Sequence, residues 1–191
     1  AEKKKKDYYI NNVVKTIKFI DICKKNNVKR FIFLSSSNVY KEPKKNKTFS
    51  VRSKTVPKNY YGKTKLIIEK YLKKKKFDEL VILRLFNIVG MFNKNFKIFN
   101  FKKENYQRLI FKLNQNTISG KTTTINYILK SSKKNFPSRD FVNIKDLAYI
   151  IFKILNIIIS KKKNFRIFNV CSGISTPIDK VISIYEKKLK K

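Results

Sequence analysis

Tyr61 and Lys65 are the residues of this chain whose types and spacing first suggest chemistry. They are four positions apart, so in a helix both side chains lie on the same face. A lysine ammonium beside a phenol favours the phenolate and lowers the phenol pKa from its ordinary value of about 10. A tyrosine placed in this way can act as a general base. A hydroxyl from elsewhere in the chain, such as that of Ser36, could bind the same substrate oxygen.

The sequence around this pair predicts a strand and a helix that would position it. Residues 28–34 are predicted to form a strand with no polar alternation after Arg30, which is typical of a buried parallel strand. Three serines follow at 35–37, and the apolar helical residues of 66–72 come directly after Lys65. Ligands of open α/β sheets bind beyond the carboxyl ends of the strands, where these serines would lie. A strand-exit turn is the alternative interpretation of the three serines.

The Tyr-x-x-x-Lys spacing alone is weak evidence, because the chain is rich in lysine. The same spacing occurs at Tyr40/Lys44, Tyr71/Lys75 and Tyr149/Lys153. The strand end and the helix start around Tyr61 are what favour that pair as a catalytic site.

The composition indicates a folded domain, or most of one, with an unusual excess of positive charge. The chain has 191 residues, 42% of them hydrophobic, and a formal net charge of +35. Such a charge could serve nucleic-acid or anionic-surface binding. However, the lysines are spread over nearly the whole sequence, and Lys, Asn, Ile, Phe and Tyr all have A/T-rich codons. We therefore expect compositional bias and no nucleic-acid partner, and a catalytically inactive basic binding protein is the alternative of another class.

Other residue types limit the environment and the chemistry. The two cysteines, Cys23 and Cys171, are predicted to be small core residues in a reducing compartment, which suggests a cytoplasmic protein. Residues 147–159 are apolar but too few for a membrane span and include Lys153, so a buried helix and no membrane are expected. The chain has no histidine, the commonest metal ligand, and no metal site is expected.

Two segments resemble a known family. Residues 35–40 read Ser-Ser-Ser-Asn-Val-Tyr and residues 60–65 read Tyr-Tyr-Gly-Lys-Thr-Lys. Both are similar to the extended short-chain dehydrogenases/reductases, the NAD-dependent epimerase/dehydratase family, and most closely to its UDP-glucose 4-epimerases. The resemblance implies NAD as the cofactor and a UDP-sugar as the substrate. It also implies that Ser36, Tyr61 and Lys65 are catalytic and contact NAD, and that Ser36 and Tyr61 contact the sugar.

Two further segments extend the resemblance. Residues 8–13 read Tyr-Tyr-Ile-Asn-Asn-Val, and the family's first asparagine, here Asn11, reaches the cofactor. The alternative role for Asn11 is a helix N-cap before an apolar helical pattern at 13–23. Residues 83–90 resemble the family's Leu-Arg-Tyr-Phe-Asn-x-x-Gly, in which Phe86 would pack near the nicotinamide and Asn87 would bind the diphosphate. The alternatives are a core residue and a turn residue, respectively.

The later part of the chain carries three more substrate-binding candidates. Asn105 and Tyr106 occupy the place of a family Asn-Leu pair that lines the nucleotide site. Residues 139–148 are similar to the family's Arg-Asp-Tyr-Ile-His-Val-x-Asp-Leu-Ala, and Arg139 would fork onto the diphosphate. The family histidine is replaced by Asn143.

The expected fold is α/β: the later part of a Rossmann-like doubly wound parallel sheet with a small substrate-binding portion. Residues 1–90 would form the catalytic half and residues 91–191 the substrate-binding portion with returning strands and helices. Within the latter we expect helices at 104–116 and 177–190, and strands at 123–127 and 165–170. No two of the four glycines lie close enough to form the family's pyrophosphate-binding turn. The resemblance implies that the segment that completes the sugar-nucleotide site after Lys191 is missing too. The chain is therefore expected to be incomplete at both ends, as a fragment or a decayed gene product, and poorly soluble alone because sheet surface would be exposed.

The implied function is NAD-dependent interconversion of UDP-glucose and UDP-galactose, by a homodimer if the family pattern holds. Hydride would pass from the sugar to NAD and return to the other face. A nucleotide-sugar 4,6-dehydratase, or another sugar-nucleotide epimerase, is the alternative. The dehydratase reaction usually needs an acidic pair beside the catalytic hydroxyl, where this chain has Ser37 and Asn38.

Overall fold

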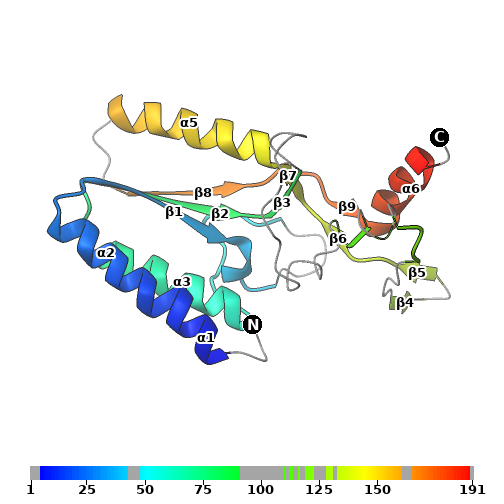
Figure 1. Cartoon of the computed structure of the whole chain (residues 1–191), viewed down its shortest axis with the longest axis horizontal. Helices are drawn as coiled ribbons and strands as arrows, with labels where there is room; N and C mark the ends of the chain where they lie inside the picture. The colour runs from blue at the N-terminus through cyan, green and yellow to red at the C-terminus, as the bar shows by residue number, and fades with distance from the viewer. Residues whose placement is uncertain are drawn as a thin grey trace. The chain divides into compact units, whose positions relative to one another are not determined.

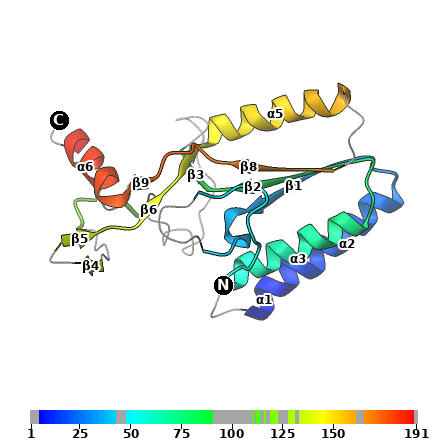
Figure 2. The same cartoon turned by 180° about the vertical axis from the view of Figure 1, so that it is seen from behind.

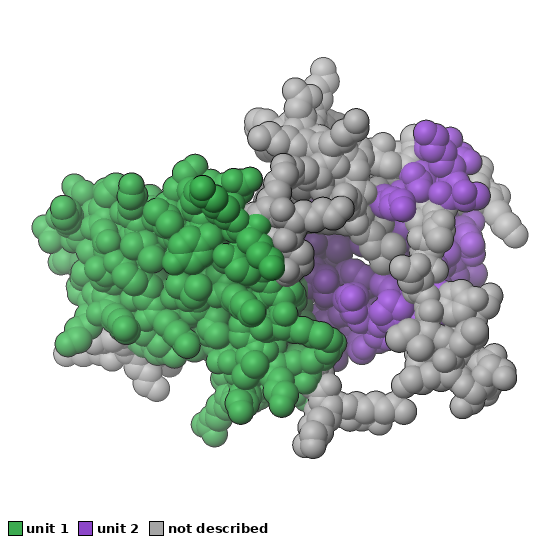
Figure 3. All heavy atoms as spheres, turned by 90° about the horizontal axis from the view of Figure 1, so that it is seen from below, with its two compact units in different colours: residues 1–86, 148–170 green, residues 87–147, 171–191 purple. Residues whose placement is uncertain are grey.

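The chain divides into two compact units. The computed structural model describes residues 5–42, 48–90, 110, 112–113, 116, 119–122, 128–130, 133–160 and 165–189. The first unit comprises residues 1–86 and 148–170, and the second comprises residues 87–147 and 171–191 (green and purple in Figure 3). Residues 148–170 thus return to the first unit, after the second unit has branched off at Asn87.

The first unit is a three-stranded parallel sheet with helices on both faces. Its elements are α1 (Lys5–Tyr9), η1 (Ile10–Val14), α2 (Lys15–Lys25), β1 (Arg30–Ser36), η2 (Ser37–Val39), α3 (Tyr60–Lys74), β2 (Glu79–Leu85), most of α5 (Ile144–Ser160) and β8 (Phe165–Val170). The strand order is β1-β2-β8, with both pairings parallel. Helices α2 and α3 cover one face and α5 covers the other (Figures 1 and 2). The parallel α/β fold predicted from the sequence is confirmed.

Helix α3 connects β1 to β2 and has clear start signals. Asn59 has an extended backbone, and its side chain accepts a hydrogen bond of 2.7 Å from the Gly62 N–H, so it is the N-cap. The helix buries Ile68 and Leu72 against the apolar residues of β1 and β2. This burial sets which face of α3 meets the sheet.

The amino-terminal helical segment is continuous from Lys5 to Lys25 and includes one π-helical turn, η1. Asn11 lies inside this turn, and the preceding Tyr9 already has helical backbone angles. Asn11 is therefore not a helix N-cap, which contradicts that interpretation. Val13 and Ile20 are buried in the core, as their helical spacing predicts.

Strand β1 is longer at its carboxyl end than the sequence suggests. Ser35 and Ser36 are still paired with β2, opposite Arg84 and Leu85, and Ser37 starts the 3-10 turn η2. The ladder continues because β2 itself extends to Leu85. Only the last of the three serines therefore belongs to the turn that follows the strand.

Two expectations about burial are wrong. Helix α5 is amphipathic rather than buried: Leu147 and Ile154 are buried, but Tyr149 and Phe152 are 60% and 59% exposed. A helix on one face of a sheet buries only the stripe that faces the strands. Cys171 is exposed, because it lies just beyond the end of β8, while Cys23 is half-buried, and both thiols are unbridged.

Across the part of the chain that the structure describes, no helix has the length and hydropathy needed to cross a bilayer.

The second unit contains short paired strands and a terminal helix. Its described elements are β3 (Asn87–Val89), β4 (Ile128–Lys130), β5 (Lys133–Asn135), β6 (Ser138–Arg139), β7 (Phe141–Asn143), β9 (Thr176–Pro177) and α6 (Ile178–Leu189). Strand β3 pairs in parallel with β7, whereas β4–β5 and β6–β9 are antiparallel pairs. The predicted strand at 123–127 and most of the predicted helix at 104–116 lie outside the described residues.

Candidate active site

The Lys65 side chain extends from α3 to the carboxyl end of β1. Its ammonium donates a hydrogen bond of 2.9 Å to the Leu34 carbonyl and lies 4.9 Å from the centroid of the Phe33 ring. The same ammonium is 5.8 Å from the centroid of the Tyr61 ring, one turn earlier on the helix. Burial lowers the pKa of the Lys65 ammonium. The helical spacing and the strand end therefore place a cation beside the Tyr61 ring.

Ser36 ends β1 with its hydroxyl in a defined position. The residue is 7% exposed, and its side-chain oxygen accepts a hydrogen bond of 3.2 Å from the Asn38 N–H, which caps the turn η2. That turn packs directly against the first turn of α3, where Gly62 lies against the Asn38 carbonyl. The first turn of α3 therefore lies beside the end of β1, so the structure brings Ser36 and the Tyr61–Lys65 pair to one region.

Ser35 has a different role from Ser36. Its hydroxyl donates a hydrogen bond of 2.6 Å to the Glu69 carboxylate on α3, and both residues are almost fully buried. Successive side chains of a strand leave on opposite faces, so neighbouring serines meet different partners. The structure thus assigns Ser35 to the contact between sheet and helix, which leaves Ser36 as the hydroxyl at the strand end.

A buried ion pair, which the sequence interpretation missed, lies next to the site. Arg84 on β2 donates to both carboxylate oxygens of Glu69, with Nε–Oε1 and Nη2–Oε2 distances of 3.0 and 2.7 Å. Burial by itself lowers the pKa of the Arg84 guanidinium, but hydrogen bonds with Glu69 and Tyr40 outweigh it and raise the pKa. The available signal was Arg84, the one charged residue in the apolar stretch 80–86, since such a charge is rarely buried unless it is paired.

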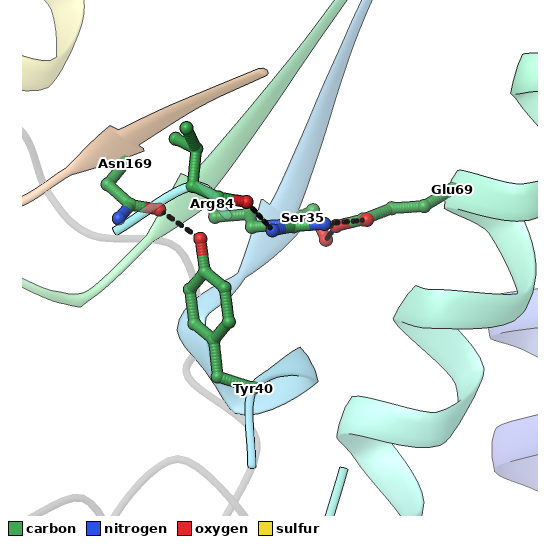
Figure 4. Close-up of polar contacts among 6 residues, drawn as sticks. Ser35, Tyr40, Glu69, Arg84 and Asn169 are labelled. Atoms are coloured by element: carbon green, nitrogen blue, oxygen red, sulfur yellow. Dashed lines mark hydrogen bonds and ion pairs between the residues drawn. The ribbon is translucent and has the colours of Figure 1, made fainter. Parts of the chain in front are cut away.

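Tyr40 contacts both the Arg84 guanidinium and a group of aromatic rings. Its hydroxyl donates to the Asn169 side-chain oxygen at 2.6 Å, and the Arg84 guanidinium lies 4.8 Å from its ring centroid (Figure 4). The Phe49 ring stacks on Tyr40 at 4.9 Å, and the half-buried Phe86 packs on Phe49 at 6.0 Å. Phe86, predicted to pack near a nicotinamide, therefore lies in an aromatic row at the end of β2.

Two predicted substrate-binding residues lie in the second unit, near Asp140. The Asn87 side chain donates to the Asp140 carbonyl at 2.9 Å, and the exposed Arg139 donates to the Ser138 carbonyl at 2.9 Å. The Asp140 carboxylate accepts both backbone N–H groups of Ser172 and Gly173 and the Ser172 hydroxyl, all at 2.8–2.9 Å. Asp140, which the sequence interpretation did not single out, thereby fixes the turn after β8.

The remaining predicted site residues lie elsewhere in the chain. Asn11 is exposed on η1, which packs against α3. Asn105 and Tyr106 lie outside the described residues. Among the described residues, no group of three or more metal-ligating side chains gathers in one place.

The other Tyr-x-x-x-Lys pairs have different surroundings. The Tyr71 hydroxyl is 2.7 and 2.8 Å from the two Asp21 carboxylate oxygens, and Lys75 forms an ion pair of 2.6 Å with the same carboxylate. Tyr149 is largely exposed on α5, with the Lys153 ammonium 5.2 Å from its ring centroid. Lys44 lies outside the described residues. The first of these pairs joins α2 to α3, whereas Lys65 is hydrogen-bonded to the Leu34 carbonyl near the end of β1.

The chain belongs to the NAD dependent epimerase/dehydratase family, whose model matches residues 1–171. Its relatives include the UDP-glucose 4-epimerase of Caenorhabditis elegans, 39% identical over 89 residues, which is 44% of this chain and 25% of the relative. UDP-glucose 4-epimerase 4 of Oryza sativa is 24% identical over 186 residues, or 94% of this chain and 50% of the relative.

Solved structures give the same picture for the fold. The UDP-N-acetylglucosamine 4-epimerase of Methanobrevibacter ruminantium, in complex with UDP-N-acetylmuramic acid, is 28% identical with a TM-score of 0.73, over 97% of this chain and 55% of that one. The UDP-Glc/GlcNAc 4-epimerase of Campylobacter jejuni is 26% identical with a TM-score of 0.75, over 99% and 57%. The chain thus spans about half the length of these proteins.

Proposed function

We propose that this chain is the catalytic part of an NAD-dependent UDP-glucose 4-epimerase, which interconverts UDP-galactose and UDP-glucose. The observation that carries the proposal is the Lys65 ammonium, fixed by the Leu34 carbonyl at 2.9 Å and lying beside the Tyr61 ring at the end of β1. The family membership and the names of the relatives support the same reaction class.

The residues at the ends of β1 and β2 fit the nicotinamide end of NAD. An ammonium has three N–H donors, of which the Leu34 carbonyl takes one, so Lys65 can also bind ribose hydroxyls. Phe86 offers a half-buried aromatic surface, and Asn11 an exposed amide on η1. NAD, when bound, would supply a reversible two-electron oxidation of carbon 4 of the sugar.

The chain's own residues would manage the proton of the sugar 4-hydroxyl. Tyr61, as the phenolate favoured by the adjacent cation, accepts that proton while the 4-keto sugar forms. Ser36 donates a hydrogen bond to the same sugar oxygen and holds it in line with the phenolate. When the keto group is reduced on its opposite face, Tyr61 returns the proton, so the enzyme ends in its starting state.

The second unit would bind the nucleotide part of the substrate. Arg139 is exposed and carries a guanidinium that can fork onto diphosphate oxygens. Asn87 lies beside the Asp140 backbone, one residue from Arg139. We assign the diphosphate to this pair, with Asn105 and Tyr106 as further nucleotide contacts.

We also propose that the enzyme works as a homodimer in the cytoplasm. Apolar side chains are exposed on the α2–α3 layer, including Phe19, Ile22 and Ile67. A second copy of the chain would cover them, and sedimentation of the whole protein at twice the monomer mass is the expected result. The two unbridged cysteines fit a reducing compartment.

Product analysis on the whole protein that contains this chain tests the reaction. With UDP-galactose and NAD, we expect UDP-glucose as the product, and conversion roughly 10²–10⁴-fold slower in the Tyr61→Phe variant. A 4-keto-6-deoxy sugar would instead identify a 4,6-dehydratase and overturn the proposal. Conversion of N-acetylated UDP-sugars alone would retain the epimerase but change its substrate.

A further inference from the structure

A row of polar residues crosses the sheet one position before the strand ends. Ser35 on β1 is paired with Arg84 on β2, which is paired with Asn169 on β8. Paired residues of neighbouring parallel strands point to the same face of the sheet, so these three side chains form one line. The next position along β1 is Ser36. The row therefore crosses the sheet one residue before the position of the proposed catalytic hydroxyl.

Glu69 connects this row to the helix that carries the proposed base. Tyr61, Lys65 and Glu69 occupy successive turns along one side of α3. Glu69 accepts hydrogen bonds from Ser35 at 2.6 Å and from two nitrogens of Arg84 at 3.0 and 2.7 Å (Figure 4). The helix is thus fixed to two strands at a point two turns beyond Tyr61, or about 12 Å along its axis.

The same row also holds the segment that leads into α3. Arg84 donates through its third nitrogen to the Val51 carbonyl at 3.3 Å. The Asn169 amide donates to the Phe49 carbonyl at 3.2 Å and accepts the Tyr40 hydroxyl at 2.6 Å. Tyr61 therefore lies between two attachments to one polar row, one before it in the chain and one after it.

The burial of this network argues for a role other than general stability. Glu69 and Arg84 are 1% and 3% exposed. Replacing a buried ion pair by apolar residues of similar size is often neutral or stabilising, so such a pair is weak evidence for a contribution to stability. A bidentate guanidinium–carboxylate pair does fix the orientation of the two side chains, because both hydrogen bonds form only in one relative orientation.

We propose that Glu69, Arg84 and Ser35 are positioning residues. They set how α3 is rotated about its axis and where it lies along the sheet, so that Tyr61, Lys65 and Ser36 meet at one substrate oxygen. This inference rests on the proposed function. The network acts through Tyr61 and Ser36. Small displacements matter at such a site, since a misplacement of about 1 Å can lower the rate roughly 100-fold.

The test uses the whole protein and a paired substitution, Glu69→Leu with Arg84→Met, which leaves no uncompensated buried charge. We expect this variant to melt cooperatively and to keep its KM for the UDP-sugar within about twofold. Its kcat should fall by about 10- to 100-fold, and the pH at which activity sets in should rise. Tyr71→Phe, which removes a different polar contact of α3, is the matched control and should keep the wild-type kcat and pH profile.

A second variant covers the case in which the pair cannot be replaced. Arg84→Lys keeps the positive charge but loses the two-pronged geometry, and it should show the same fall in kcat at unchanged KM. Wild-type kcat and pH profile in either folded variant would overturn the proposal.

A readout without substrate separates this inference from the proposed function. The phenol of Tyr61 can be titrated by ultraviolet absorbance. Its titration curve is the curve of the protein that has Tyr61 minus the curve of the same protein with Tyr61→Phe. Its midpoint should rise when the Glu69–Arg84 pair is replaced, even if the wild-type protein turns over no UDP-galactose. An unchanged midpoint would count against the positioning role itself.

Discussion

The α-carbon of Gly62 lies against the backbone carbonyl of Asn38, with no room for a β-carbon between them. A methyl group at this position would overlap the Asn38 oxygen and lie 3.0 Å from the Pro57 side chain. Glycine inside a helix costs about 0.5–1 kcal/mol relative to alanine. Here it allows the first turn of α3 to approach the turn after Ser36, which places the Tyr61 helix beside the end of β1.

Gly62→Ala should therefore damage both stability and activity. The obstructing atom is backbone, which cannot rotate away, so the start of α3 must shift. We expect a loss of about 1–3 kcal/mol in the free energy of unfolding, as for other overpacked sites. Turnover should fall by about 100-fold because the base moves relative to Ser36. Thermal melts and kcat measure the two effects, and Lys63→Ala on the exposed side of the same turn is the control. A fully active Gly62→Ala enzyme would show that this close approach is dispensable.

Tyr61→Phe should lower kcat by roughly 10²–10⁴-fold, the usual range for a positioned acid or base. The substitution keeps the ring and removes only the titrating oxygen, so the melting temperature should change little. Steady-state kinetics with UDP-galactose and a thermal melt provide the measurements.

Tyr71→Phe and Tyr149→Phe are built-in controls for this prediction, because each belongs to another Tyr-x-x-x-Lys pair. The Tyr71 hydroxyl donates to Asp21, and Tyr149 is exposed. Both variants should retain normal turnover. Loss of activity in a folded Tyr149→Phe protein would show that the site has been assigned to the wrong pair.

Lys65→Met should raise the pH at which activity sets in, since the phenolate loses its neighbouring cation. In the wild-type protein, burial lowers the pKa of Lys65 below 10.5, so the cation is lost at a lower pH than for an exposed lysine. The cost of burying this charge is present below the folded pKa and disappears as the pH rises towards 10.5. The substitution should therefore not lower the melting temperature near pH 7. A pH–rate profile that coincides with the wild-type curve would contradict the role of Lys65; Lys63→Met is the control.

Asp21→Asn should destabilise the protein in a pH-dependent way. Hydrogen bonds from Lys75 and then from Tyr71 lower the pKa of the Asp21 carboxyl below 3.8. A depressed carboxyl pKa contributes stability above the unfolded value of 3.8, and this contribution is lost as the pH falls through the folded pKa. The variant should melt slightly below the wild type at pH 7 and level with it well below pH 3.8. A constant difference across that range would attribute the effect to packing instead.

The net charge of +35 should confer no tight nucleic-acid binding. In a retention assay on single-stranded DNA near physiological salt (about 0.15 M), we expect only weak binding that falls steeply with added salt. Tight binding at that salt concentration would favour a basic binding protein over an enzyme.

Local patterns in the sequence were enough to define much of this protein. The spacing of Tyr61 and Lys65 placed both on one helix face, because the helical repeat is a local property. The apolar residues that follow Arg30 predicted a buried parallel strand, and the strand at 165–170 has the predicted bounds. The choice of Ser36 among the three serines came from the resemblance of residues 35–40 to the family's motif.

The tertiary structure decided what depends on partners distant in the sequence. Ser35 and Ser36 have the same side chain, and only their strand phase and the position of Glu69 distinguish their roles. Tyr40 meets Asn169 across 129 positions, a contact that the strand order and register create. The exposure of Tyr149 and Cys171 likewise depends on which face of α5 meets the sheet and on where β8 ends. Periodicity fixes which residues share a face, but only packing determines what that face contacts.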